Sequence, residues 1–363
     1  MRKMPLWAVI LTDFLALAVI LLTFCYFHHV RPNVVAEVSE VSIDNPHRLG
    51  GDSSAPEETE EPSFPDESEE SSTAVIEISD DTTSEETTEE PPVESSETSS
   101  TPTYRPATTE ITERRPTEYV YESNDINVTV TELLVSTRYG QSVCHFADIR
   151  ISYAENLQTV LAQNKFGTVR EDPVSMAERV NAIVAINGDY YGNSSEAYGA
   201  VIRNGVLYNK KPDNPDVFVM YTNGSMKAFD KASFDADTEM SAGAYQSWDF
   251  GPSLLDADGN PYSNVEFGKK TNLNPANPRS VIGYFEPGHY CFVTVNGRGG
   301  DGRSVGLRME DLAKLMSDLG CKAAYNLDGG ATSALIFRGK VINSPCNGNA
   351  RACSDLISIV EFE

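Results

Sequence analysis

An acidic, low-complexity segment in the first third of the chain limits where a folded core can form. Residues 51–100 carry 18 acidic side chains and no Lys or Arg, and Ser, Thr, Glu and Pro dominate this segment and its flanks. Apolar residues are too few there to offset the entropy lost when a backbone is ordered. We therefore predict a disordered stalk over residues 28–125 and one folded domain over residues 126–363.

The net charge of −26 belongs mainly to the predicted stalk. Residues 126–363 carry 21 Lys and Arg against 27 Asp and Glu, a net charge of −6, which leaves −20 for the rest of the chain. The overall acidity therefore says little about a functional surface on the domain. Because no basic stripe with interleaved aromatic residues occurs in the sequence, we expect no nucleic-acid partner.

An apolar segment near the amino terminus, residues 6–27, reads LWAVILTDFLALAVILLTFCYF. Its length matches the ~20 residues that a helix needs to cross a bilayer. Arg2 and Lys3 precede it, which predicts that residues 1–5 stay in the cytoplasm and that the C-terminal domain is extracytoplasmic. A cleaved signal peptide is the alternative, but the following His-His-Val-Arg-Pro offers no small-residue cleavage site. We expect a single-pass anchor in the cell membrane, with the lipid bilayer as a partner.

Hydrophobic periodicity predicts a single mixed α/β domain in which strands outnumber helices. Helices are expected over residues 174–180, after an Asp172-Pro173 start signal, and over residues 309–319. Asn204-Gly205 and Asn223-Gly224 predict hairpins. Strands are expected at residues 126–131, 144–151, 182–186, 280–285, 290–295, 322–325, 333–337 and 356–362.

Four polar segments, three of which contain glycine, lie at the ends of short predicted strands and are candidates for a functional site. They are residues 187–191, 278–280, 296–303 and 326–330. Each one taken alone is also explained as an ordinary turn, since Asn-Gly and Asp-Gly are common turn pairs. The sequence contains no P-loop, and the two histidines of the predicted domain, His145 and His289, lie near no candidate nucleophile, so neither an NTPase nor a Ser-His-Asp hydrolase is expected. The remaining carboxylates, amides and arginines suit a glycosyl reaction on an anionic substrate.

The segment GRGGDGRSVGLRMEDLAKLMSDLGCKAAYNLDGGATSAL at residues 297–335 resembles the signature of the phosphodiester glycosidase family. NGDYY at 187–191 is similar to the NGG-aromatic motif of that family, although Asp189 stands where many members have glycine. PRSVIG at 278–283 and RACSD at 351–355 resemble two further motifs of the family. The family has lysosomal members and bacterial members linked to exopolysaccharide, and the resemblance covers about residues 126–363.

This resemblance implies hydrolysis of the bond between a sugar C1 and a phosphodiester on a surface or exported glycan. A phosphate monoester is already a good leaving group, so such a site needs cations for the phosphate and a carboxylate that attacks or activates water. We assign the catalytic carboxylate to Asp328, with Asn187 and Asp189 orienting sugar hydroxyls or water. Substrate and phosphate contacts are expected from Arg279, Arg298, Asn326, Gly329, Gly330 and Arg351.

Two other functions remain open from the sequence: a non-catalytic module that binds phosphate-linked glycan, and a transferase that remodels wall polymers. We predict no cofactor and no metal site. Calcium or magnesium stays an alternative if Asp189, Asp301 and Asp328 converge, although their spacing matches no calcium loop. Cys346 and Cys353 are close enough in sequence to form a disulfide.

Overall fold

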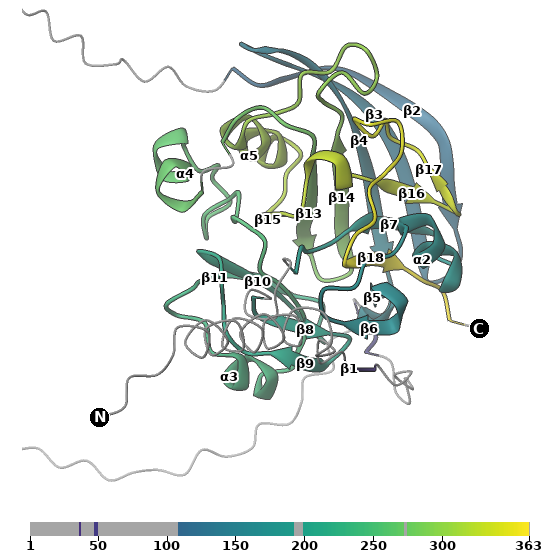
Figure 1. Cartoon of the computed structure of the whole chain (residues 1–363), viewed down its shortest axis with the longest axis vertical. Coiled ribbons are helices and arrows are strands. Elements are labelled where there is room, and N and C mark those ends of the chain that lie inside the picture. Colours follow the sequence, from purple (N-terminus) through teal and green to yellow (C-terminus); the bar gives the residue numbers. More distant parts are fainter. Residues whose placement is uncertain (1–35, 38–46, 50–107, 192–198, 272–273, 363) are drawn as a thin grey trace, which may run out of the picture. The chain divides into compact units, whose positions relative to one another are not determined.

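The structure is a computed structural model that describes residues 36–37, 47–49, 108–191, 199–271 and 274–362 (Figure 1). All of these belong to one compact unit, Met1–Gly51 with Pro106–Glu363. The predicted membrane segment, residues 6–27, and most of the predicted stalk lie outside the described residues. Within the described ranges, no helix is both long and apolar enough to cross a bilayer.

A six-stranded antiparallel sheet forms one layer of the domain, with the strand order β15-β13-β14-β4-β3-β2 (Figure 1). Its strands are β2 (Glu110–Glu122), β3 (Ile126–Thr137), β4 (Gly140–Ile151), β13 (Arg279–Glu286), β14 (His289–Val295) and β15 (Ala323–Asn326). Successive side chains of a strand point to opposite faces, and in this sheet apolar side chains lie on both faces. Val128 and Ile282 face one core cluster, whereas Leu133 and Val281 face another.

A five-stranded antiparallel sheet packs on the first, with the order β17-β16-β7-β18-β5. Its strands are β5 (Leu157–Leu161), β7 (Val184–Asn187), β16 (Leu335–Phe337), β17 (Lys340–Val341) and β18 (Asp355–Ile359). Ile186 and Ile357 from this sheet join Val128 and Ile282 in one cluster of fully or almost fully buried side chains. The main core therefore lies between the two sheets.

Helices cover the outer faces of both sheets (Figure 1). Helices α4 (Asn264–Lys270) and α5 (Met309–Asp318) pack on the six-stranded sheet through residues such as Phe267 and Leu312. Helix α2 (Pro173–Arg179) packs on the five-stranded sheet through Met176. The Asp172 side chain accepts a hydrogen bond from the Ser175 N–H and so caps α2 as predicted.

Smaller sheets complete the domain. A three-stranded sheet contains β10 (Asp216–Tyr221), β11 (Met226–Asp230) and β12 (Ala244–Trp248), with α3 (Ala236–Ser241) beside β12. Strands β8 (Val201–Arg203) and β9 (Val206–Asn209) pair, as do β1 (Ala36–Glu37) and β6 (Lys165–Phe166). Turns at Asn204-Gly205 and Asn223-Gly224 connect β8 to β9 and β10 to β11, so both predicted hairpins are confirmed.

The predicted strand-rich domain with few helices is confirmed, but its predicted start at Ile126 is wrong. Strand β2 pairs with β3 from Glu110 onwards. Further upstream, the Leu49 N–H donates to the Ser152 carbonyl oxygen (2.5 Å), and the Leu49 side chain is buried in the main core. Strand β2 lies at the sheet edge with mostly exposed side chains, so its sequence lacks the apolar alternation that marks an inner strand.

The disulfide suggested between Cys346 and Cys353 does not form. The cysteines in the described part of the chain, Cys144, Cys291, Cys321, Cys346 and Cys353, are all free thiols. Cys353 is buried and pairs through its backbone with Glu171, whereas Cys346 lies half-buried in a separate loop. Proximity in sequence did not bring the two sulfur atoms together.

Candidate active site

The segment that follows β15 carries Asp328 and connects the two large sheets. The Leu327 N–H donates to the Ser280 carbonyl oxygen in β13 at 2.8 Å. The next N–H, that of Asp328, donates to the Gly188 carbonyl oxygen, just beyond the end of β7, at 3.1 Å. Because β13 and β7 belong to different sheets, the Asp328 backbone is fixed where the two sheets meet.

A pocket of about 230 Å³ opens beside Asp328. It is lined by Phe250, Asn277, Pro278, Arg279, Arg298, Asp328, Gly329, Gly330, Ala331 and Arg351. Six of the nine predicted site residues therefore come together: one carboxylate, three arginines and two glycines. The other three, Asn187, Asp189 and Asn326, are not among the lining residues.

The Asp328 carboxyl group lies at the wall of this pocket, and the residue is 8% exposed. Its Oδ1 accepts the Gly329 N–H at 2.8 Å, and its Oδ2 lies 3.4 Å from Nη2 of Arg351. Arg351 is held in turn by the Thr332 hydroxyl oxygen, which accepts from Nη2 at 2.6 Å. Burial raises the pKa of Asp328, although the Thr332 hydrogen bond and the Arg351 charge act in the opposite direction. A carboxylate with a raised pKa is suited to act as a general base.

Arg279 and Arg298 form the cationic side of the pocket. Arg279 is buried, and its Nε and Nη2 donate to the carbonyl oxygens of Leu307 (3.1 Å) and Pro275 (2.7 Å). Burial lowers the pKa of Arg279 to about 10, and the charge of Arg298 contributes. The group therefore remains protonated at neutral pH. Arg298 is exposed and donates from Nε and Nη2 to Oδ1 of Asn277, at 3.0 and 2.7 Å.

The glycines of the Asp328 turn make room for neighbouring groups. Gly330 has a positive φ of 66°, and a Cβ there would lie 3.3 Å from Nη1 of Arg298. A Cβ on Gly329 would lie 2.8 Å from the Pro278 carbonyl oxygen, closer than real Cβ atoms approach. Glycine at these two positions lets the Pro278 backbone and the Arg298 side chain lie close to the turn that follows Asp328. The substrate contact predicted for both glycines stays a prediction.

Asn187 lies behind the pocket and holds the Asp328 backbone in place. Its Nδ2 donates to the Asp328 carbonyl oxygen at 2.6 Å. Its Oδ1 accepts from the Ser280 hydroxyl (2.7 Å) and the Ala334 N–H (3.1 Å), and the residue is fully buried. We predicted that Asn187 orients sugar or water, but the structure occupies its amide with protein partners instead.

Asp189 belongs to a buried ion cluster formed by Arg203, Asp189, Asp355 and Tyr191. Nη2 of Arg203 lies 2.9 Å from Asp189 Oδ2 and 2.8 Å from Asp355 Oδ2. The Tyr191 hydroxyl donates to Asp355 Oδ2 at 2.5 Å. Burial raises the pKa of Asp189 to about 7, although Arg203 acts in the opposite direction. Asp189 stands at the motif position where many members of the resembled family have glycine, and its carboxylate pairs with Arg203, which the sequence did not single out.

Asn326 supports the segment that supplies Phe250 to the pocket. Its Nδ2 donates to the Gly251 carbonyl oxygen at 2.8 Å, and its N–H donates to that of Pro252 at 3.1 Å. Its Oδ1 is buried without a hydrogen-bond partner among the described residues. The Asn326 side chain therefore contacts the segment just after Phe250, and Asn326 itself is not among the lining residues of the pocket. No motif marked Phe250 or Asn277 as pocket residues.

A further arginine near the pocket, Arg170, was also missed. Its charge is close enough to Asp328 to lower the pKa of that carboxyl group. Its guanidinium carbon lies 4.6 Å from the centroid of the Tyr190 ring, within the range of a cation–π contact. A lone arginine in the segment before α2 carries no motif, so sequence reasoning had no signal for it.

The described residues contain no group of three or more His, Cys, Asp and Glu side chains arranged to hold a metal ion. Asp301, one of the three carboxylates considered for calcium or magnesium, accepts hydrogen bonds from Ser304 and Asn296 in its own loop. Asp189 pairs with Arg203, and Asp328 faces the pocket alone. The convergence that a cation site required is not present among these three groups.

Comparison with known proteins identifies related sequences. Residues 180–360 match the family described as phosphodiester glycosidase. The SPbeta prophage-derived uncharacterized protein YomE of Bacillus subtilis (strain 168) is 35% identical over 199 residues. That alignment covers 53% of this chain and 30% of YomE, so the chain spans less than a third of the length of this relative.

Comparison with solved structures identifies a similar fold at low sequence identity. The catalytic domain of zebrafish N-acetylglucosamine-1-phosphodiester alpha-N-acetylglucosaminidase, auto-inhibited by its pro-peptide, has a TM-score of 0.55 and 18% identity. This match covers 69% of the present chain and 88% of the zebrafish one. A hypothetical protein from Synechocystis has a TM-score of 0.45 and 17% identity, over 64% of this chain and 61% of that one. At these identities the likeness to the zebrafish domain concerns the fold alone.

Proposed function

Because the chain belongs to the phosphodiester glycosidase family, we propose that its pocket hydrolyses the bond between a sugar C1 and a phosphodiester. The observation that carries the proposal is the convergence of the Asp328 carboxylate with Arg279, Arg298 and Arg351 in one pocket. A sugar phosphodiester combines an anionic group with an electrophilic carbon. A pocket that combines guanidinium groups with a carboxylate complements both parts.

The arginines would hold the phosphate while Asp328 acts at the sugar. Guanidinium groups present several N–H donors in a plane and bind phosphate oxygens better than an ammonium group does. Asp328 takes a proton from a water molecule whose oxygen bonds to C1. The bond between C1 and the phosphate oxygen breaks, and its electron pair leaves with the phosphate monoester. The products are a free sugar and a phosphate monoester.

The substrate class we propose is a phosphate-linked glycan on a surface or exported polymer. The printed name of the zebrafish enzyme includes an N-acetylglucosamine-1-phosphodiester, which makes this compound class the first one to assay. Incubation in ¹⁸O-labelled water, followed by mass spectrometry, tests the proposal. Glycosidic cleavage places the label on the sugar. Label on the phosphate would show phosphodiesterase chemistry instead, and binding without turnover would favour a phosphoglycan-binding module.

Replacing Arg298 with asparagine is expected to raise KM for a sugar-1-phosphodiester about 10- to 100-fold, because a charge-assisted hydrogen bond to phosphate is lost. Arg298 is exposed and has a φ of 51°, a conformation that asparagine tolerates, so the melting temperature should not change. Arg303→Asn is the matched control, since this exposed arginine of the same loop does not line the pocket. Equal KM values for the two variants would contradict a phosphate contact by Arg298.

We also propose that the domain works outside the cytoplasm, tethered by residues 6–27. The support is the apolar length of that segment and the basic residues before it. The full chain is expected to stay in the membrane pellet after alkaline carbonate washing, whereas a chain without residues 1–27 should be released. Protease added to intact cells should reach the domain. Release of the full chain, or protection from protease, would contradict the proposal.

A further inference from the structure

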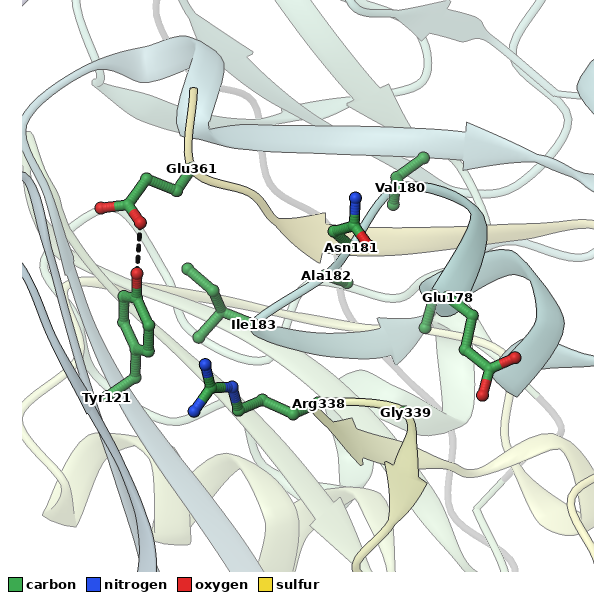
Figure 2. A pocket seen from close by; sticks show the side chains of 10 residues that line it. Tyr121, Glu178, Val180, Asn181, Ala182, Ile183, Arg338, Gly339 and Glu361 are labelled. Atoms are coloured by element: carbon green, nitrogen blue, oxygen red, sulfur yellow. Dashed lines mark hydrogen bonds between the residues drawn. The ribbon is translucent and has the colours of Figure 1, made fainter. Parts of the chain in front are cut away.

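A second pocket, of about 540 Å³, lies at the opposite end of β7 from Asp328 (Figure 2). Residues before β7, up to Ile183, line this pocket, whereas the far end of β7, at Asn187, holds Asp328. Strand β16 runs antiparallel to β7, and Arg338, the residue after β16, lines this second pocket. The two pockets share no lining residue. A volume of this size is within the range of about 300–1,000 Å³ found for small-molecule sites.

The second pocket combines an apolar floor with a polar rim. The floor contains Ala177, Val180, Ala182 and Ile183. The rim contains Tyr121, Glu178, Asn181, Arg338 and Glu361. Figure 2 shows Tyr121 and Glu361 at one end, Glu178 at the other, and Arg338 between them. These polar groups come from four separate parts of the chain, with Glu178 and Asn181 both at the end of α2, so the fold brings the parts together.

Three of the rim groups, Tyr121, Glu361 and Arg338, contact one another or the neighbouring backbone. The Tyr121 hydroxyl donates to the Glu361 carboxylate. The Arg338 guanidinium carbon lies 5.4 Å from the centroid of the Tyr121 ring. The backbone N–H of Arg338 donates to the Ile183 carbonyl oxygen at 3.0 Å. Hydrogen bonds from Ser123 and Tyr121 lower the pKa of Glu361, which keeps this group an ionised acceptor at neutral pH.

The backbone of Arg338 gives an independent sign that this side chain is functional. Arg338 and Gly339 form the turn between β16 and β17, with φ values of 46° and 76°. Turns with two positive φ values favour Asn, Asp and Gly, because other side chains are strained there. An arginine at such a position costs stability, and strained residues of this kind cluster at ligand sites. Asn181, across the pocket, also has a positive φ of 52°.

We propose that this second pocket binds an uncharged saccharide. A pyranose ring has an apolar C–H face and a rim of hydroxyl groups, which match the apolar floor and the polar rim. Glu178 and Glu361 offer acceptors, and Arg338 and Asn181 offer donors, for neighbouring hydroxyls. With two carboxylates against one arginine the rim has a net charge of −1, which disfavours phosphate and other anions. The site is thus chemically distinct from the arginine-rich pocket around Asp328 and does not depend on catalysis there.

Binding of neutral tetrasaccharides to the full chain tests the inference. Chitotetraose, maltotetraose and cellotetraose would be titrated by calorimetry, with inorganic phosphate as the anionic probe. At least one tetrasaccharide should bind, and Arg338→Asn and Glu178→Gln should each weaken its binding about tenfold. Asparagine is favoured in this turn, so Arg338→Asn should fold normally. Lys340→Gln is the matched control, because it removes a positive charge beside the same turn without lining the pocket.

The outcomes separate this inference from the proposed hydrolysis. Asp328→Asn should leave the tetrasaccharide affinity unchanged while activity is lost, and Arg338→Asn should leave cleavage of a small sugar phosphodiester unchanged. The inference is overturned if none of the three tetrasaccharides binds at millimolar concentration. It is also overturned if binding responds to Arg298→Asn but not to Arg338→Asn, or if phosphate displaces the bound sugar from Asp328→Asn protein.

Discussion

Asp328→Asn is expected to lower kcat for a sugar-1-phosphodiester about 10²- to 10⁴-fold, which is the contribution typical of a positioned general acid or base. Among the described residues that line the arginine-rich pocket, Asp328 is the only one with a carboxylate. Asparagine keeps the shape and can still accept the Gly329 N–H through its amide oxygen. It cannot take a proton from water. Substrate binding through the arginines should therefore persist while chemistry stops.

Folding of this variant should be close to that of the wild type. Burial raises the pKa of Asp328, so the native environment already disfavours the charged form that asparagine removes. Thermal unfolding and binding of the intact phosphodiester provide the checks, with Asp258→Asn, at an exposed turn, as the matched control. Near-normal release of free sugar by Asp328→Asn would rule out the catalytic assignment.

The pH profile gives a second measure of the same group. A general base must be ionised, so activity should fall as the pH drops through the pKa of Asp328. Because that pKa is raised, the acidic limb of kcat/KM should lie above the ordinary aspartate value of about 3.9. A limb at or below this value would mean that another group, or none, takes the proton.

Arg203→Met is expected to lower the free energy of unfolding by about 3–5 kcal/mol, the usual cost of removing one partner from a buried ion pair. Arg203 is 1% exposed and bonds both Asp189 and Asp355. Methionine has an unbranched apolar side chain but leaves two buried carboxylates next to each other. Asp355 also accepts the Asp189 N–H at 2.7 Å, so the end of β7 near Asp328 should loosen as well.

The stability defect of Arg203→Met should shrink as the pH falls. Burial raises the pKa of Asp189 to about 7, above its unfolded value, so the folded state takes up a proton more readily than the unfolded one. Protonation of Asp189 therefore adds most to the free energy of unfolding below the unfolded-state pKa of about 3.9, and this contribution is lost as the pH rises through 7. Without Arg203 this dependence should steepen. Urea unfolding at pH 5 and pH 8 measures the difference.

Two variants make the Arg203 experiment specific. Arg179→Met removes a partly exposed arginine paired with Glu171, and we expect a change below about 1 kcal/mol. Adding Asp189→Asn and Asp355→Asn to Arg203→Met should recover part of the lost stability, since the unpaired charges are gone. A defect that is the same at both pH values, or no defect at all, would show that the cluster does not carry the energy assigned to it.

The sequence predicted the inner strands of both sheets well because their signals are local. Strand β14 is mostly apolar in sequence, as expected of a buried strand. Asn-Gly pairs mark the turns of the hairpins. Edge strand β2 has mostly exposed side chains, so it carries no comparable pattern. Local signals therefore fail where a segment is stabilised by backbone pairing with a distant strand rather than by its own apolar face.

For the site, the sequence indicated which segments meet but not where each side chain points. Asp328 and Arg279 line the pocket as predicted, whereas Asn187 and Asp189 turn into the domain and bond to protein groups. Asn187 ends β7 and Asp189 lies beyond it, and their partners come from other segments of the chain, so a motif alone does not decide which side chain reaches the ligand. Arg203 was missed because its role depends on two carboxylates far away in sequence.

The packing of the two large sheets against each other limits how far this protein can be truncated. Residues 180–360, the range of the family match, exclude three strands of the six-stranded sheet (β2, β3 and β4) and β5 of the other sheet. In a fragment of that range, β14 and β18 would become unpaired edge strands. The fragment would also lack Val128 and Leu133, which belong to the cores on the two faces of the six-stranded sheet. Soluble expression should therefore require a start upstream of Glu110.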